Sequence, residues 1–382
     1  MISLPGVLKG FVHRPGGHCG SSAMRDIFEF YGHRFTEEMI FGLGAGLDFM
    51  YLTAPEMNPP VYFSGRSDTM EKDLCTHLGV WVEQRFGLSD EEAWAVAKAR
   101  LDAGEPVMVT ADVHYLDYLH VARRFSGHRI VIAGYDEEAG VAYIADNDRD
   151  AIQACSLASL RRARASDALP FPSQNSYFEF RFPERLNNVE EAIRRAIRLA
   201  VRHMLKPLPG AGGESLKYPA DAVLGLPAIK YLAEEIRRWP EQLSAVQLVE
   251  LMWTTYVYVE KGGTGYGGNF RRIYGRFLAE AGELLRDRQL SALAPEFVAI
   301  GDGWSRLAKE LKEAARERIA DGRSGPDSSG GLDGPDGPSS LLSGPGGLDG
   351  LMPALRRAQQ QLRELYSREE AAIARLANWL ES

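Results

Sequence analysis

The stretch HRIVIAGYDEEAGVAYIADN (128–147) decides the fold class of the first half of the chain. Two runs rich in β-branched and aromatic residues, 128–135 and 141–147, flank DEEAG, whose length and composition are typical of a hairpin. Similar β-rich runs are PVMVTADV (106–113) and the alternating YFEFRF (177–182). These runs together predict an antiparallel sheet.

Helical signals come before the sheet. GSSAMRDIFEFYG (20–32) has apolar residues at helical spacing and ends at a glycine, and SDEEAWAVAKARLDAG (89–104) opens with a Ser/Asp cap and early acids. Residues 1–183 are therefore predicted to form an α+β domain, in which early helices pack on an antiparallel sheet.

After residue 183 the apolar periodicity becomes helical, which predicts an all-α domain over 184–382. A segment at 320–350 is so rich in Gly, Ser, Pro and Asp that it is expected to be a disordered surface insertion. The predicted helices are 189–205, 226–239, 244–260, 270–286, 303–319 and 353–382.

Composition excludes several classes of protein. The 382 residues are 45% apolar and 25% charged, which excludes a fibrous or wholly disordered chain. No apolar run approaches the roughly eighteen residues of a membrane span, and the first residues lack the apolar core of a signal peptide, so a cytoplasmic protein is expected. The net charge of −8 lies entirely in 1–183, and 184–382 is neutral, which argues against binding to nucleic acid.

The chain has three cysteines, too few and too scattered for a disulfide framework or a zinc site, and no metal site is expected. Cys19 directly precedes a predicted helix, whose positive N-terminal end favours the thiolate. Cys75 and Cys155 stand among apolar residues and are expected to be buried. Cys19 is therefore the candidate nucleophile.

A base and an orienting carboxylate accompany Cys19. His128 opens one predicted strand and Asp146 ends the next, and adjacent antiparallel strands bring such positions together. Singly, His128 reads as a strand-end histidine and Asp146 as a turn residue. Together with Cys19 they have the residue types of a nucleophile, a base and a group that orients the base.

These residues lie in two blocks that resemble the butirosin biosynthesis protein H family: HCGSSAMRDIFEFYGHRFTEEMIFGLGAGLDFMYL (18–52) and DVHYLDYLHVARRFSGHRIVIAGYDEEAGVAYIADN (112–147). GLPAIKYLAEEI (225–236) and GGTGYGGNFRRIYGRFLAEA (262–281) are similar to the helical region that accompanies that domain. The resemblance implies an acyltransferase of antibiotic biosynthesis. It would take an acyl group from the phosphopantetheine thioester of an acyl carrier protein to a small-molecule amine, with no cofactor of its own. Homo-oligomer formation stays open.

The same layout also resembles bacteriocin-processing cysteine peptidases, which implies a papain-like fold. Those enzymes have a glutamine upstream of the cysteine that helps to form the oxyanion hole. This sequence has none, and the residue six positions before Cys19 is His13. The backbone at Cys19 and Gly20 is expected to supply part of the hole, and His13 or His18 the rest, with a structural role open for either histidine.

Two glycine-rich segments invite a phosphate-binding interpretation. FGLGAGL (41–47) matches neither the P-loop nor the dinucleotide pattern, so its glycines are expected to allow close backbone approach beside the active site. GGTGYGGNFRRIY (262–274) leads into a predicted helix, as anion sites do. Its Gly267, Gly268, Arg271 and Arg272 are candidates to hold the donor phosphate; the alternative is a flexible turn with an exposed basic face.

Two other functions stay open. The first is a cysteine peptidase or amidohydrolase that uses Cys19, His128 and Asp146 on an amide bond. The second is an inactive papain-like module that serves as a scaffold, against which the retention of all three residues argues.

Overall fold

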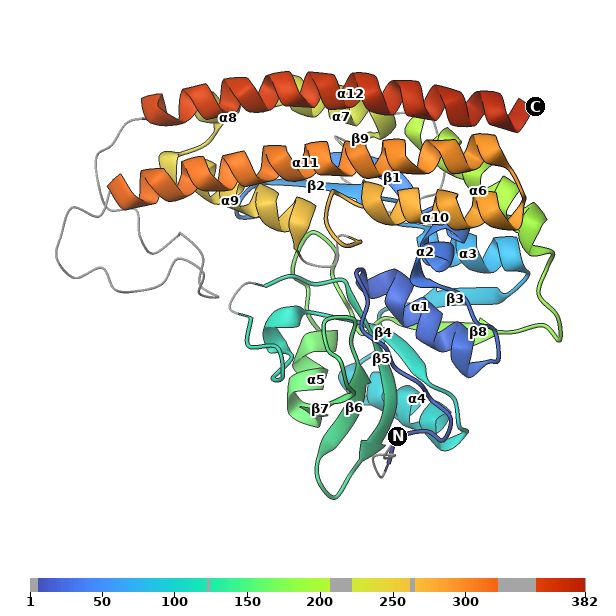
Figure 1. Cartoon of the computed structure of the whole chain (residues 1–382). Helices are drawn as coiled ribbons and strands as arrows, with labels where there is room; N and C mark the ends of the chain where they lie inside the picture. The colour runs from blue at the N-terminus through green and yellow to red at the C-terminus, as the bar shows by residue number, and fades with distance from the viewer. Residues whose placement is uncertain (1–5, 122–123, 207–221, 262–264, 322–347, 382) are drawn as a thin grey trace. The chain divides into compact units, whose positions relative to one another are not determined.

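The chain forms two compact units in the computed structural model (Figure 1). We call Met1–Ile40 with Glu71–Val189 the sheet unit, and Phe41–Met70 with Glu190–Ser382 the helical unit. Each has its own β-sheet and its own buried apolar residues. The structure describes residues 6–121, 124–206, 222–261, 265–321 and 348–381.

The sheet unit contains a six-stranded antiparallel sheet in the order β3-β8-β4-β5-β6-β7. β5 and β6 form the predicted hairpin, with Asp136 opposite Val141, and Ala111 on β4 lies opposite His128 on β5. The α+β fold class is therefore confirmed. The strands are β3 (Trp81–Arg85), β4 (Val107–Ala111), β5 (His128–Asp136), β6 (Val141–Ala145), β7 (Gln153–Ser156) and β8 (Tyr177–Arg181).

Helices α1, α4 and α5 contact the middle strands of this sheet, β4 and β5. Alternate side chains of these strands, such as Val109, Ile130 and Ile132, are fully buried in its core. Ser89 and Glu92 form a capping box that begins α4 where the acidic first turn predicts it. The helices of this part of the chain are α1 (Cys19–Phe30), α2 (Glu37–Leu43), α3 (Met70–Leu78), α4 (Asp90–Asp102), α5 (Leu157–Arg164) and the 3₁₀ turn η1 (Val113–Tyr115).

The helical unit is dominated by two long helices, α11 (Arg288–Asp321) and α12 (Met352–Glu381), which run side by side (Figure 1). α11 begins fifteen residues before the predicted helix at 303–319, and Pro295 lies inside it without ending it. The other helices are α6 (Val189–Met204), α7 (Gly225–Glu235), α8 (Trp239–Gln242), α9 (Ala245–Glu260), α10 (Arg271–Leu284) and the 3₁₀ turn η3 (Leu348–Leu351).

Residues 41–70 fall in the helical unit, so the predicted domain of 1–183 is not continuous. They form β1 (Leu47–Thr53) and β2 (Val61–Arg66), and β1 pairs with β2 on one side and with β9 (Val223–Leu224) on the other. Six of the seven β1 residues are buried. A strand that is buried on both faces carries no alternation, and its partner β9 is remote in sequence, so the local pattern missed this sheet.

The glycines of 41–47 allow close packing within the helical unit. A Cβ atom on Gly42 would lie 2.0 Å from the ring of Phe277 on α10.

The predicted insertion at 320–350 falls mostly on residues 322–347, which lie outside the described residues. Its flanks belong to α11 and to η3. Among the helices that the structure describes, none combines the length and the apolar content needed to cross a membrane.

Candidate active site

Cys19 is the first residue of α1, at the helix start that the sequence predicts, and part of its surface is exposed. Burial raises the pKa of the thiol, but its interactions with His128 and His18 outweigh this effect, so the pKa lies well below its ordinary value. The pKa of His128 moves in the opposite direction: burial lowers it, but Asp146 and Cys19 raise it well above the ordinary value. These opposite shifts both favour a thiolate–imidazolium pair.

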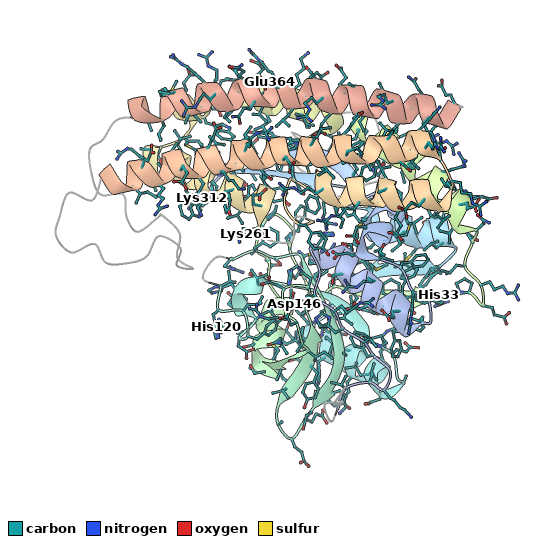
Figure 2. The ribbon with its side chains drawn as sticks, in the orientation of Figure 1. His33, His120, Asp146, Lys261, Lys312 and Glu364 are labelled. Carbon is teal, nitrogen blue, oxygen red and sulfur yellow. The ribbon has the colours of Figure 1, made fainter. Side chains whose placement is uncertain are left out.

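Asp146, labelled in Figure 2, follows directly on β6. Nε2 of His128 lies 3.0 Å from each oxygen of the Asp146 carboxylate, whose side chain is fully buried. Burial raises the pKa of Asp146, but its contacts with His128 and Tyr118 lower it, so the group is ionised. Because the carboxylate occupies Nε2, Nδ1 is the ring nitrogen left for Cys19. The structure thus brings together the three residues that the sequence predicts.

Tyr118 completes this arrangement. Its hydroxyl donates to Oδ2 of Asp146 at 2.9 Å. Burial and the Asp146 charge raise the pKa of Tyr118 well above its usual value, so it stays a donor. The run HYLDYLH contains two tyrosines, and nothing in their spacing shows which of them contacts Asp146. Tyr118 could therefore not be identified from the sequence.

Glu37, buried at the start of α2, fixes the loop that leads to Cys19. Its carboxylate accepts the backbone N–H groups of Gly17 at 2.9 Å and His18 at 2.8 Å, and the Ser21 hydroxyl at 2.9 Å. A Cβ atom on Gly16 would lie 2.6 Å from this carboxylate. Glu37 is not among the predicted site residues, because an acid in the first turn of a helix usually faces water.

His13 is part of a buried charged cluster with Asp26 and Arg25 of α1. Its Nδ1 lies 2.7 Å from the Asp26 carboxylate and its Nε2 lies 2.9 Å from the carbonyl oxygen of Arg149. Both partners only accept, so both ring nitrogens donate. Burial lowers the pKa of His13, but Asp26 and the carbonyl raise it above the ordinary value. No N–H of His13 is left for a substrate oxygen, which leaves His13 the supporting role.

The backbone of Gly20 lies in the first turn of α1, where no earlier helical carbonyl accepts the N–H groups. Those of Cys19 and Gly20 are therefore in the position expected for oxyanion donors. Within the described residues, no three His, Cys, Asp or Glu side chains gather as a metal site would require.

Cys19 should be the cysteine that reacts with iodoacetamide. Cys75 on α3 and Cys155 on β7 are buried, and burial raises the pKa of both thiols. Since the pKa of Cys19 is lowered, its thiolate persists as the pH falls, and its alkylation rate should change little between pH 8 and pH 6. Peptide mapping after brief labelling at both pH values measures this. Labelling of Cys75 or Cys155 first, or a rate that falls tenfold per pH unit, would contradict the assignment.

Arg271, a predicted phosphate ligand, does not face a ligand at all. Its guanidinium is fully buried in the helical unit and forms a two-bond pair with Glu369 of α12, at 2.9 and 2.7 Å. Its Nη1 donates to carbonyl oxygens of Asp48 on β1 and Gly65 on β2. The phosphate-binding prediction is therefore wrong for Arg271.

Gly267, Gly268 and Arg272 are also engaged within the protein. Residues 265–270 all have positive φ, which explains the glycines, and the Gly268 N–H donates to Glu260 at 3.0 Å. Arg272 donates to Asp302 at 2.9 Å and to Ser305 at 2.7 Å. The anions that these residues contact are the chain's own carboxylates.

Comparison with family models gives two matches. Residues 18–147 match the model described as butirosin biosynthesis protein H, N-terminal. Residues 158–325 match a domain of unknown function, DUF4872. The first match begins at His18 and ends at Asn147, so it contains Cys19, His128 and Asp146. A search of curated proteins found no match.

Proposed function

Because this chain belongs to the family of butirosin biosynthesis protein H, we propose that it is an acyltransferase of specialised metabolism. The donor is the phosphopantetheine thioester of an acyl carrier protein, and the acceptor is a small-molecule amine. The observation that carries the proposal is the arrangement of Cys19 at the start of α1 with His128, whose ring Asp146 holds at 3.0 Å, and the opposite pKa shifts of Cys19 and His128 agree with it. Cys19 begins a helix that packs on an antiparallel sheet, and His128 and Asp146 belong to that sheet or directly follow one of its strands. This arrangement also supports a papain-like fold for the sheet unit.

Two half-reactions transfer the acyl group. The Cys19 thiolate forms a bond to the thioester carbonyl carbon, and the carbonyl electron pair moves onto oxygen. When this pair returns, the bond to the pantetheine sulfur breaks, and that sulfur takes the proton of His128. The amine then attacks the acyl-enzyme, neutral His128 accepts its proton, and the Cys19 thiolate leaves.

Asp146 supports both steps. Its ionised carboxylate at Nε2 keeps the ring oriented and stabilises the imidazolium each time His128 holds two protons. A thioester is activated enough for this residue set, since its leaving group is a thiolate and needs only one proton.

The test is to trap the acyl-enzyme. The full-length protein is mixed with a butyryl thioester of N-acetylcysteamine, and intact mass is followed with time. We expect one butyryl group on Cys19 and none in a Cys19→Ala variant. The acyl group should leave faster with an added primary amine than with water alone. Rapid hydrolysis that amines do not outcompete would support the peptidase or amidohydrolase alternative, and no adduct would contradict both.

A further inference from the structure

His18 is almost fully buried and caps α1 with its side chain. Its Nδ1 accepts the backbone N–H of Ser21 at 3.2 Å. The Ser21 hydroxyl lies 3.0 Å from the same nitrogen and 2.9 Å from the Glu37 carboxylate, and these two acceptors share its hydrogen. Because a backbone N–H can only donate, Nδ1 presents its lone pair, and the hydrogen of the ring is assigned to Nε2.

The two imidazoles at Cys19 are therefore held by different kinds of partner. A carboxylate holds His128, which favours the imidazolium and suits proton transfer. At His18, Nδ1 accepts from a helix-start N–H, which leaves Nε2 as the ring nitrogen that carries a hydrogen. The Cys19 sulfur interacts with both rings. His18 thus places an N–H donor beside the Cys19 sulfur. Glu37 holds the loop that contains His18 by accepting its backbone N–H.

We infer that His18 is a catalytic residue whose Nε2–H stabilises the oxyanion formed when the Cys19 thiolate attacks the acyl carbonyl. This inference rests on the proposed acyl transfer. As the carbon–sulfur bond forms, the carbonyl electron pair moves onto oxygen, and Nε2–H donates a hydrogen bond without giving up its proton. The N–H groups of Cys19 and Gly20 at the helix start supply further donors. The bond weakens again when the oxyanion collapses and the pantetheine thiolate leaves.

Two substitutions separate the capping role from the donor role. In His18→Asn the amide oxygen can take the place of Nδ1 as cap acceptor, because asparagine is a preferred N-cap residue, but nothing remains at the Nε2 position. In His18→Gln an amide N–H reaches the Nε2 position, and the cap is weakened instead. Thermal unfolding of both variants verifies that the full chain is folded.

Each variant is assayed by two reactions of Cys19. Acylation by the butyryl thioester of N-acetylcysteamine passes through an oxyanion. Alkylation by iodoacetamide displaces iodide from a saturated carbon and forms none. Both rates are read on the pH plateau, where the thiol is fully ionised, so that a change in its pKa does not enter. We expect His18→Asn to slow acylation about 10²–10³-fold, the cost of one oxyanion donor, with alkylation changed less than threefold. His18→Gln should recover most of the loss.

Three results would overturn the inference. Unchanged acylation in His18→Asn would leave His18 as a cap alone. Equal losses in both reactions would mean that it acts through the reactivity of the sulfur. A wild-type protein that is alkylated at Cys19 but never acylated would overturn the proposed function itself, and the oxyanion role with it.

Discussion

His128→Asn should slow acylation of Cys19 by about 10³-fold at pH 7, within the 10²–10⁴ that a positioned acid–base group contributes. The substitution removes the proton that the leaving thiolate needs. It also removes the cation that, with His18, holds the pKa of Cys19 down against the effect of burial. Thioester-driven acylation of the full-length protein, followed by intact mass, measures the loss.

The pH dependence of the alkylation rate shows in which direction His128 shifts the pKa of Cys19. A thiol whose pKa is depressed is ionised at neutral pH and below. Without His128 the pKa of Cys19 rises, so the rate with iodoacetamide should fall at pH 6 and recover as the pH increases. The matched control is His120→Asn, which changes an exposed histidine of the same unit (Figure 2). Equal rates for the two variants at pH 6 would mean that His128 does not activate the thiol.

The three residues of the triad could be predicted from the sequence because each stands at the beginning or end of a helix or strand. A cysteine before a helix, a histidine that opens a strand and an aspartate after the next strand are local signals. One rule of antiparallel pairing then joins the last two. His128 and Asp146 do flank the β5–β6 hairpin in this way.

The residues that position the loop before Cys19 could not be predicted from the sequence in this way. Arg25 and Asp26 lie on α1, where neighbouring charges usually indicate a solvated face, yet both are buried. Their charges are satisfied by the loop before Cys19: Asp26 binds His13 at 2.7 Å, and Arg25 donates to the carbonyl of Pro15 at 3.2 Å. Helical periodicity reports apolar faces and does not show which buried charges find partners.

In the glycine–arginine segment, 262–274, the predicted partner was a phosphate and the partner found for Arg271 is a carboxylate of the same chain. Glycines before a helix with arginines predict an anion. The partner of Arg271 is Glu369, 98 residues away on α12, and spacing within a segment carries no information about such a distant carboxylate.

Arg271→Met should destabilise the helical unit by about 3–5 kcal/mol, since it leaves the Glu369 carboxylate buried without its cation. Two carbonyl groups, of Asp48 and Gly65, lose their donor at the same time, and these contacts tie β1 and β2 to α10. For a unit of this size the midpoint of thermal unfolding should fall by roughly 6–20 °C. The matched control is Arg272→Met, which breaks a partly exposed pair with Asp302 and should cost about 1 kcal/mol or less.

A double variant decides whether the cost comes from the unpaired charge. Adding Glu369→Leu to Arg271→Met removes the buried carboxylate, so part of the lost stability should return, although the Trp304 indole N–H then loses its acceptor at 2.7 Å. At a temperature where Arg271→Met stays folded, its acylation by a carrier-protein thioester and by the N-acetylcysteamine thioester should change by the same factor. A selective loss with the carrier donor, at unchanged stability, would restore Arg271 as a phosphate ligand, because a group that only holds the fold cannot distinguish two donors of the same acyl group.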